Sequence, residues 1–448
     1  MLFPMIAREG AASAEKVHAT GLVGGDVEAR VRFHLRELTT MSEASPASPT
    51  PRERWLVPLL LCGLFIYAMG QTLLFAVLGP IVREIGLPEI AMGLTISCSA
   101  IAFTIATSIW GRASDRIGRM PPILIGLAGY AVITVAFAGV LEMGMAGWLA
   151  PSVVLVLMIV VRMTLTATAG GLQPASTAFM ADRTTAANRA GGVALIGAAF
   201  GLGSVFGPVF GGLLSRIGLL APLYISAVMA LTIVAAVWWM WRGQTPAPKR
   251  DAPPALKLTD PRLLPFMVLI GAIFTVFAVI QQTTAFYVQD MLGLDAAETA
   301  SSAGLVIGAM ALAQFAAQSV VARLSGVPVR IYVQLGVWLM LAGLIVASLA
   351  ADLIMLAASY LLLGAGQGLS QPGLMAAGSL AVSPEEQGSA AGRMTSGIGT
   401  GFILGPLIGT GLYTWSHSAP LAFAVIFMGI IAVSVLIAPR LRRVQAGR

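Results

Sequence analysis

The feature that most restricts the fold of this chain is a series of twelve apolar stretches, each 20 residues or longer. A spanning α-helix needs about 20 apolar residues, whereas a strand of a membrane β-barrel needs about 10 residues of alternating polarity. The stretches are continuous, so they predict helices that cross a bilayer. They occupy residues 55–79, 90–111, 121–141, 150–175, 190–214, 220–241, 263–287, 299–322, 329–350, 354–377, 391–414 and 419–438.

Composition excludes a soluble protein of this size. Of the 448 residues, 57% are hydrophobic and 10% are charged, whereas about a quarter are charged in soluble domains. The apolar content excludes a disordered chain, and the presence of only two cysteines, Cys62 and Cys98, excludes a disulfide scaffold. The sequence therefore predicts an all-α membrane protein with twelve transmembrane helices.

The apolar stretches divide the chain into five regions. Residues 1–54 lack the apolar core of a signal peptide and are predicted to be a disordered cytoplasmic tail, with Met41 as a plausible true start. Residues 55–242 form a first six-helix bundle and 263–438 a second. Residues 243–262, rich in Pro, Lys and Arg, form a cytoplasmic linker, and 439–448 a basic cytoplasmic tail.

The distribution of Lys and Arg predicts the orientation. With a cytoplasmic N-terminus, the outer loops carry only Arg83 and Arg216. The other loop arginines and lysines then lie inside, as the positive-inside rule requires, and both termini are cytoplasmic. The net charge of +7 is therefore a topology signal rather than a sign of nucleic-acid binding.

An internal repeat relates the two bundles. A shift of 198 residues places eight Gly, Gln and Pro residues of the first bundle on identical residues of the second. A six-helix unit duplicated in the same orientation predicts a substrate path between the halves, near the midplane. The pairs are Gly170/Gly368, Gln173/Gln371, Pro174/Pro372, Gly201/Gly399, Gly203/Gly401, Gly207/Gly405, Pro208/Pro406 and Gly211/Gly409.

The loop after the second stretch reads Gly-Arg-Ala-Ser-Asp-Arg-Ile-Gly-Arg, residues 111–119. This loop resembles the signature of the major facilitator superfamily, which implies two pseudo-symmetric six-helix bundles and alternating access. In that family the loop latches the cytoplasmic gate when the cavity faces outward. Alternatively, its charges only set the topology. The predicted latch residues are Gly111, Asp115, Arg116, Gly118, Arg119 and Asp182, and Asp182 is expected to pair with Arg116 or Arg119.

The fifth stretch resembles a motif of the antiporter branch of that superfamily, which contains many drug exporters. Glycines at four-residue spacing form a groove for a neighbouring helix, and a proline bends it. The alternative is generic packing of small residues, because Gly405 and Pro406 recur in the second half. The motif residues are Gly201, Gly203, Gly207, Pro208, Gly211 and Gly212.

Arg162 is the only basic residue well inside a predicted span, and such a charge is a functional candidate by default. The resemblance implies a role in proton transfer, and the alternative is a structural pairing. Polar residues on the first, fourth, seventh and tenth stretches suit a polar or anionic organic molecule, or else they join helices by hydrogen bonds. The predicted cavity residues are Gln71, Arg162, Thr166, Gln281, Gln282, Tyr360, Gln367 and Gln371.

Acidic residues avoid the middle of every stretch. The nearest candidates for a coupling proton are Glu84 and Asp290, which we interpret as solvated residues at helix ends. There is no Walker loop and no spacing typical of a metal or catalytic site, so we expect neither a cofactor nor a metal, and no enzyme.

Taken with the resemblance, these features predict a secondary-active exporter of small organic molecules, multidrug or related, working by proton antiport. A dedicated exporter of a polar natural product such as a siderophore is the first alternative, and a proton-coupled uptake symporter is the second. The expected partners are the substrate, protons and the lipid bilayer, for a monomer in a bacterial-type inner membrane.

Overall fold

The computed structural model describes residues 51–184, 189–241, 256–257, 259–324, 326–383 and 386–437. The tail 1–50 with its candidate start, most of the predicted linker and residues 438–448 lie outside these ranges. Within them the chain forms helices and no β-strand. The helices are α3 (Pro51–Glu84), α4 (Ile90–Ile117), α5 (Met120–Met145), α6 (Pro151–Ala169), α7 (Leu172–Arg183), α8 (Arg189–Leu214), α9 (Ala221–Trp241), α10 (Leu264–Leu292), α11 (Ala296–Arg323), α12 (Val329–Ser348), α13 (Leu353–Leu380), α14 (Gln387–Trp415) and α15 (Ala419–Ile437).

Among the described residues, eleven helical segments are long and apolar enough to cross a membrane. One of them, Pro151–Arg183, consists of α6 and α7 joined by a turn at Gly170 and Gly171, and it extends beyond the predicted end at residue 175. Helix α14 is continuous over 29 residues, but its sequence contains many Gly, Ser and Thr residues among the apolar ones. It packs against both α4 and α10. With α14 included, the segments match the twelve predicted stretches.

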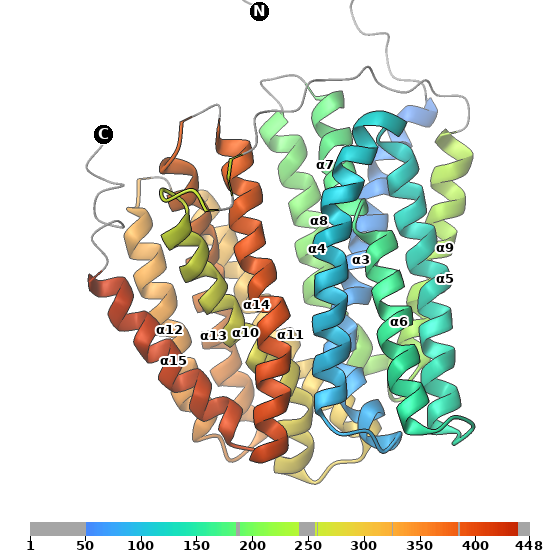
Figure 1. The fold of residues 1–448 in the computed structure, drawn as a ribbon, viewed down its shortest axis with the longest axis vertical. Helices are drawn as coiled ribbons and strands as arrows, with labels where there is room; N and C mark the ends of the chain where they lie inside the picture. Colours follow the sequence, from blue (N-terminus) through green and yellow to red (C-terminus); the bar gives the residue numbers. More distant parts are fainter. Residues whose placement is uncertain are drawn as a thin grey trace, which may run out of the picture. The chain divides into compact units, whose positions relative to one another are not determined.

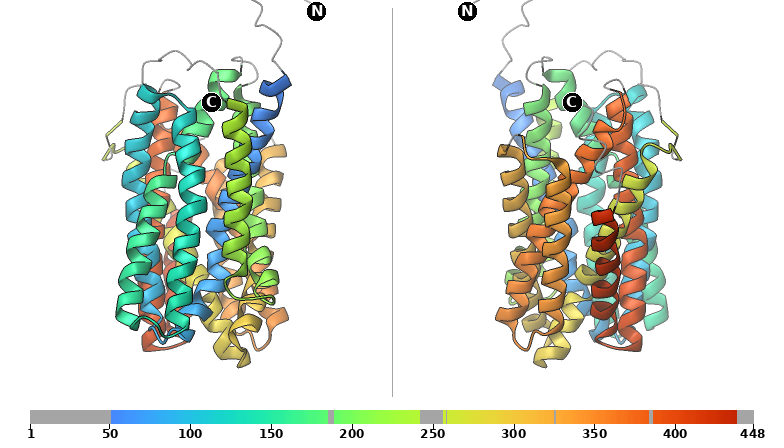
Figure 2. Two further views of the ribbon diagram at one scale, coloured as in Figure 1. Left: turned by 90° about the vertical axis from the view of Figure 1, so that its right-hand side faces the viewer. Right: turned by 90° about the vertical axis from the view of Figure 1, so that its left-hand side faces the viewer.

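Figure 1 shows α3–α9, here called the first half, on the right and α10–α15, the second half, on the left. Figure 2 shows these halves from their outer faces, with α5, α6 and α9 in front in one view and α12 and α15 in the other. All packing described below concerns residues from Leu56 onward, which form one compact unit.

The repeat in the sequence corresponds to a repeat in the packing inside each half. A Cβ built on Gly211 of α8 would lie 3.0 Å from the carbonyl oxygen of Leu73 in α3. A Cβ built on Gly409 of α14 would lie 2.9 Å from the carbonyl oxygen of Val279 in α10. Glycine at these positions allows the backbones to approach closely. Thus α8 packs on α3 as α14 packs on α10.

The Gly-Pro pairs also form the contacts between the halves. A Cβ built on Gly304 of α11 would meet the carbonyl oxygen of Pro208 in α8. In the same way, a Cβ built on Gly93 of α4 would lie 2.7 Å from the carbonyl oxygen of Pro406 in α14. Each half therefore presents one proline-bent, glycine-rich helix to a glycine of the other. This explains why the motif of the fifth span recurs in the eleventh.

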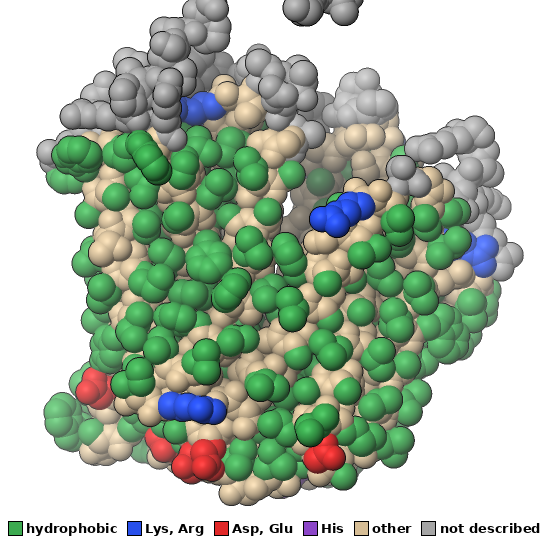
Figure 3. All heavy atoms as spheres, turned by 180° about the vertical axis from the view of Figure 1, so that it is seen from behind, with side chains coloured by type: hydrophobic (Ala, Val, Ile, Leu, Met, Phe, Trp, Pro, Cys, Tyr) green, Lys and Arg blue, Asp and Glu red, His purple; other side chains and the backbone are tan. Residues whose placement is uncertain are grey.

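The halves meet closely at one end of the bundle, named here the Arg83 end, where the loop between α3 and α4 lies (bottom of Figure 1). A Cβ on Gly79 of α3 would lie 3.0 Å from Cβ of Ala285 in α10, and one on Gly212 would lie 2.9 Å from the carbonyl oxygen of Ala300. Figure 3 shows a hollow between the halves towards the opposite end, named here the Asp115 end. The arrangement is closed at the Arg83 end and opens towards the Asp115 end.

The lateral surface is apolar. Figure 3 shows hydrophobic side chains over most of the face, with Asp and Glu gathered at its lower end. Large side chains such as Ile105, Val132 and Val156 are more than half exposed on the helices. Apolar area of this extent fits contact with lipid acyl chains.

Candidate functional site

A buried arginine lies near the middle of the first half. Arg162 of α6 is 5% exposed, and its Nη2 donates to Oε1 of Gln71 in α3 at 2.5 Å. It follows Pro151, the first residue of α6, by eleven positions, which places it about 16 Å along the helix from the Arg83 end. The two predicted interpretations of Arg162 were a role in proton transfer and a structural pairing. The structure shows a neutral polar partner on a neighbouring helix. Among the described residues, no carboxylate lies within electrostatic range of the guanidinium.

Two tyrosines missed by the sequence analysis lie beside this arginine. Tyr67 of α3 and Tyr130 of α5 lie within electrostatic range of Arg162. Their rings meet edge to face, with centroids 5.5 Å apart. The hydroxyl of Tyr130 donates to Oγ of Ser226 in α9 at 3.0 Å. Tyr67 lies one helical turn before Gln71 in α3, a spacing that could have indicated a shared face.

Thr166, another predicted cavity residue, serves helix packing. Its hydroxyl donates to the carbonyl oxygen of Ser99 in α4 at 3.0 Å and to that of Arg162 at 3.1 Å. In this conformation Thr166 therefore joins two helices by a hydrogen bond, which was the alternative to a role in the cavity.

The second half contains a separate group of buried amides. Gln281 and Gln282 of α10 and Gln367 of α13 are at most 7% exposed, and each has at least one side-chain polar atom without a partner. The hydroxyl of Tyr360 in α13 lies 2.8 Å from Oγ1 of Thr284 in α10. No hydrogen bond of the described residues joins this group to Arg162 or Gln71. Buried amides without partners are unusual in native structures and indicate positions where a ligand or water binds.

Gln371 of α13, one helical turn after Gln367, has hydrogen-bond partners on a neighbouring helix. Its Oε1 accepts from Nε2 of Gln314 at 3.4 Å and from Nε2 of Gln318 at 3.3 Å, both in α11. The amides join α11 to α13 inside the second half.

The loop at the Asp115 end holds a network of ion pairs around Arg119. Its Nη1 lies 2.5 Å from Oδ1 of Asp115, and its Nε lies 3.3 Å from Oδ2 of Asp182 in α7. Nη1 also donates to Oγ of Ser114 at 2.9 Å. All these residues belong to the first half. Of the two expected partners of Asp182, the structure thus selects Arg119, while the side chain of Arg116 is exposed.

The two glycines of this loop differ. Gly118 ends α4 with φ of 92°, a conformation that favours glycine, and so permits the tight turn between α4 and α5. A Cβ on Gly111 would meet nothing within 4 Å. Among the described residues, no neighbouring helix therefore packs closely against Gly111 in this conformation.

A second ion-pair network joins the halves at the Arg83 end. Nη1 and Nη2 of Arg83 in α3 lie 2.6 and 2.9 Å from Oδ1 and Oδ2 of Asp290 in α10. Nη2 also lies 2.8 Å from Oε1 of Glu89, which precedes α4. The hydroxyl of Tyr413 in α14 donates to Oδ2 of Asp290 at 2.6 Å, and Nδ1 of His417 lies 3.6 Å from the same atom. We call Arg83, Asp290, Glu89, Tyr413 and His417 the Arg83 clasp.

Asp290 is exposed near the end of α10, as predicted, but it is also part of an ion pair between the halves. Its side chain is 26% exposed and forms a bidentate ion pair across the halves. The guanidinium of Arg83 also lies over the Phe286 ring, 5.0 Å from its centroid. Glu84 is also exposed, as expected. The structural reason for the ion pair is that α3 and α10 come close together at this end, which brings Asp290 to Arg83.

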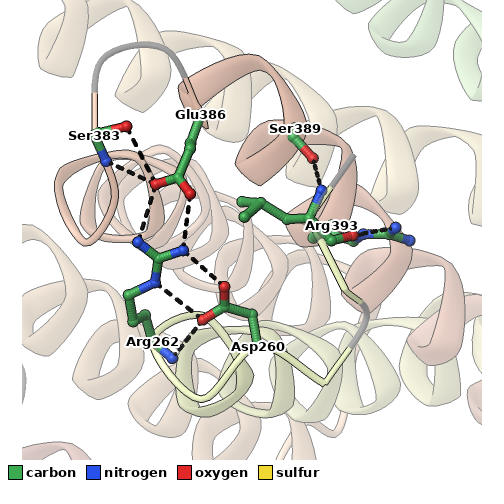
Figure 4. A network of polar contacts seen from close by, with 7 residues as sticks. Asp260, Arg262, Ser383, Glu386, Ser389 and Arg393 are labelled. Carbon is green, nitrogen blue, oxygen red and sulfur yellow. Dashed lines mark hydrogen bonds and ion pairs between the residues drawn. The ribbon is translucent and has the colours of Figure 1, made fainter. Parts of the chain in front are cut away.

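A third network ties the end of the linker to the second half (Figure 4). Arg262 lies 2.8 Å from Asp260 and 2.9 Å from Glu386, which precedes α14. Nearby, Nε of Arg393 donates to the carbonyl oxygen of Leu256 at 2.8 Å. Hydrogen bonds from Arg262 lower the pKa of both carboxyls, Asp260 and Glu386, below their ordinary values.

This network predicts a pH dependence. Because the folded-state pKa values are lowered, the network's contribution to stability is present above the ordinary carboxyl pKa values, and it is lost as the pH falls through the lowered ones. We expect infrared difference spectra, assigned with Glu386→Gln, to show Glu386 protonating below about pH 4.3, the ordinary value. Arg262→Gln should raise that midpoint, and Arg330→Gln, at the same end, should not. An unchanged midpoint in Arg262→Gln would contradict this account.

No group of three or more His, Cys, Asp or Glu side chains within the described ranges is arranged to hold a metal ion. Every described Asp and Glu lies in a loop or within about two turns of a helix end. The arrangement is a helical bundle with polar groups at mid-depth and ion pairs at both ends, which is the construction of a membrane transporter.

Comparisons with known proteins identify the family. The chain matches the sequence profile of the Major Facilitator Superfamily over residues 60–325 and 298–447. The chain therefore belongs to the Major Facilitator Superfamily, has the fold that the loop motif implied, and is a multi-pass membrane transporter rather than an enzyme.

Similar proteins include two bacterial resistance proteins. "Multidrug resistance protein 1" of Bacillus subtilis (strain 168) is 32% identical over 175 residues, which cover 39% of this chain and 41% of that protein. The chain thus spans about two-fifths of the length of that relative. "Tetracycline resistance protein, class G" of Vibrio anguillarum is 30% identical over 395 residues, covering 82% of this chain and 92% of that protein.

Solved structures show the same fold. A bacterial homolog of the human lysosomal transporter Spinster, in an inward-facing and occupied conformation, superposes with a TM-score of 0.70 at 15% identity, covering 88% of this chain and 98% of that one. The nucleoside transporter NupG superposes with a TM-score of 0.66 at 13% identity, covering 87% and 98%.

Proposed function

We propose that this protein is a secondary-active exporter of small organic molecules that works by alternating access and proton antiport. The observation that carries the proposal is the division of charge among three levels. One ion-pair network joins the halves at the Arg83 end, and a second network lies within the first half at the Asp115 end. A buried arginine, Arg162, lies between these two ends. A transporter that opens to one side at a time needs a separable contact at each end of a central site.

The direction of transport is inferred from the relatives. Two of the similar proteins are named for resistance to tetracycline or to several drugs. The glycine and proline pattern of α8, which resembles the antiporter motif, supports the same direction. A dedicated exporter of a polar natural product is the second candidate, because the mid-depth residues are amides and an arginine rather than an apolar lining.

The orientation follows from the positive-inside rule, which places the Asp115 end in the cytoplasm of a bacterial-type cell and the Arg83 end outside. The conformation closed at the Arg83 end is then the inward-facing state. The proposed location is the inner membrane, with both termini cytoplasmic and the protein acting as a monomer.

Transport into everted membrane vesicles tests this function. Vesicles acidified inside are expected to accumulate tetracycline or ethidium when the protein is present, and a protonophore should collapse the accumulation. Vesicles that carry the Asp115→Asn variant are the matched control, because the same protein is inserted with its loop impaired. Accumulation that persists without a proton gradient would exclude proton coupling, and uptake in right-side-out vesicles would favour the symporter.

A further inference from the structure

The buried charge of Arg162 lacks a counter-ion. Its guanidinium is 5% exposed and bonded to a neutral amide, and within the described chain the titratable groups in electrostatic range of it are Tyr67 and Tyr130, with no Asp or Glu. Buried charges in proteins are normally paired, because an uncompensated one is costly to remove from water. In the middle of a membrane protein this deficit is larger still. The site therefore lacks a negative charge.

Two donors at this site also lack acceptors. Nε of Arg162 and Nε2 of Gln71 are buried and have no hydrogen-bond partner among the described residues. They belong to the two side chains joined by the 2.5 Å bond from Nη2 to Oε1, so the free donors lie on side chains in direct contact. Turning the Gln71 amide over does not help, because its NH₂ group would then face the guanidinium. The missing partner is thus an acceptor as well as an anion.

We propose that Arg162 and Gln71 bind the carboxylate of an organic anion, and that anions of this class are substrates of the transporter. A carboxylate supplies both missing features, since its two oxygens accept hydrogen bonds and carry the charge that balances a guanidinium. A cation meets repulsion at this position, and a neutral amide supplies an acceptor but no charge. The rings of Tyr67 and Tyr130, which meet edge to face beside the guanidinium, are placed to contact the organic part of the ligand.

Binding measurements on the purified full-length protein test this assignment. Calorimetry would compare 2-naphthoate with two matched probes, neutral 2-naphthamide and cationic 2-naphthylmethylammonium. We expect 2-naphthoate to bind roughly tenfold or more tightly than either, because hydrogen bonds to charged groups contribute most. Arg162→Gln should remove this preference, and Arg162→Lys should keep part of it. Arg323→Gln, which removes an exposed arginine at a helix end, should change nothing.

Two outcomes overturn the proposal. One is that native protein does not bind 2-naphthoate or binds it no better than the amide. The other is that the preference survives in Arg162→Gln. Thermal unfolding without ligand adds an independent readout, because removing an uncompensated charge should leave the midpoint of Arg162→Gln unchanged or raised. A lowered midpoint would instead show that the bond of Arg162 to Gln71 stabilises the fold by more than the uncompensated charge costs, and it would count against the site.

Only the claim that the anion is transported rests on the proposed export function. The anion-binding site and the export function can therefore be refuted separately. Equilibrium binding needs neither a membrane nor a gradient. Selective binding of 2-naphthoate without accumulation of any probe in everted vesicles would refute export and leave the anion site intact. Accumulation of cationic drugs in everted vesicles, without any preference for 2-naphthoate in binding, would refute the anion site and leave the export function intact.

Discussion

Asp290→Asn is expected to open the Arg83 end of the transporter and to shift its conformational equilibrium by roughly 30-fold. In the native protein both carboxylate oxygens of Asp290 bind the guanidinium of Arg83, at 2.6 and 2.9 Å, across the boundary between the halves. The asparagine keeps the shape and one acceptor but loses the charge. Hydrogen bonds to charged groups contribute roughly 2 kcal/mol, which corresponds to that ratio.

Losing the ion pair between Arg83 and Asp290 should change the equilibrium between the conformations closed and open at the Arg83 end, rather than the stability of the fold. Arg83 keeps its bonds to Glu89 within the first half, at 2.8 and 3.1 Å, when the halves separate. Position 290 keeps Tyr413 as a neighbour within the second half. Each half therefore retains its own contacts, and only the bond between them weakens.

Distances between spin labels across the Arg83 end would measure the shift. Trp148, between α5 and α6, and Leu349, after α12, are 78% and 68% exposed and lie in opposite halves at this end. Labelled cysteines at these positions should show a longer distance population in Asp290→Asn. Glu89→Gln is the matched control, since it removes a carboxylate from the same arginine without touching the bond between halves. Equal shifts in both variants, or none in either, would contradict the assignment of Asp290.

The sequence predicted the helices and the repeat well, because both depend on local patterns. Runs of apolar residues identify spanning helices from length alone. The Gly-Pro pairs at Pro208 and Pro406 recur at one shift, since each half needs the same close approach between its helices. The turn at Gly170 and Gly171 was missed because glycine is common within membrane helices and does not by itself indicate a break.

The pairing of distant residues could not be predicted. Arg83 and Asp290 are 207 positions apart and stand near the ends of α3 and α10. Each looked like an isolated charge at a helix end, because the convergence of these helices is a property of the assembled bundle. A usable signal existed in the opposite charges near corresponding ends of the first and seventh helices. Similarly, Gln71 and Arg162 were both predicted as cavity residues, but only the packing of α3 on α6 shows that they bond to each other.

Asp115→Asn is expected to shift the same equilibrium in the opposite sense and to reduce transport roughly tenfold or more. Arg119, the partner of Asp115 at 2.5 Å, has its described contacts inside the first half in this conformation, where the Asp115 end is open. The resemblance to the family loop implies that the network meets the second half only when this end closes. Weakening it disfavours the closed Asp115 end and returns the protein to the state described here.

Counterflow in proteoliposomes would measure the transport loss, and the Trp148–Leu349 label pair would report the state. The thermal midpoint should hardly change, because the Asp115 side chain is 41% exposed and such ion pairs contribute at most about 1 kcal/mol. Asp260→Asn, which removes a carboxylate outside the loop, is the control. Since the two end contacts oppose each other, the double variant Asp115→Asn, Asp290→Asn should restore part of the native distance distribution. Full transport by Asp115→Asn, or a double variant no nearer to native than Asp290→Asn alone, would leave the loop with a role in topology only.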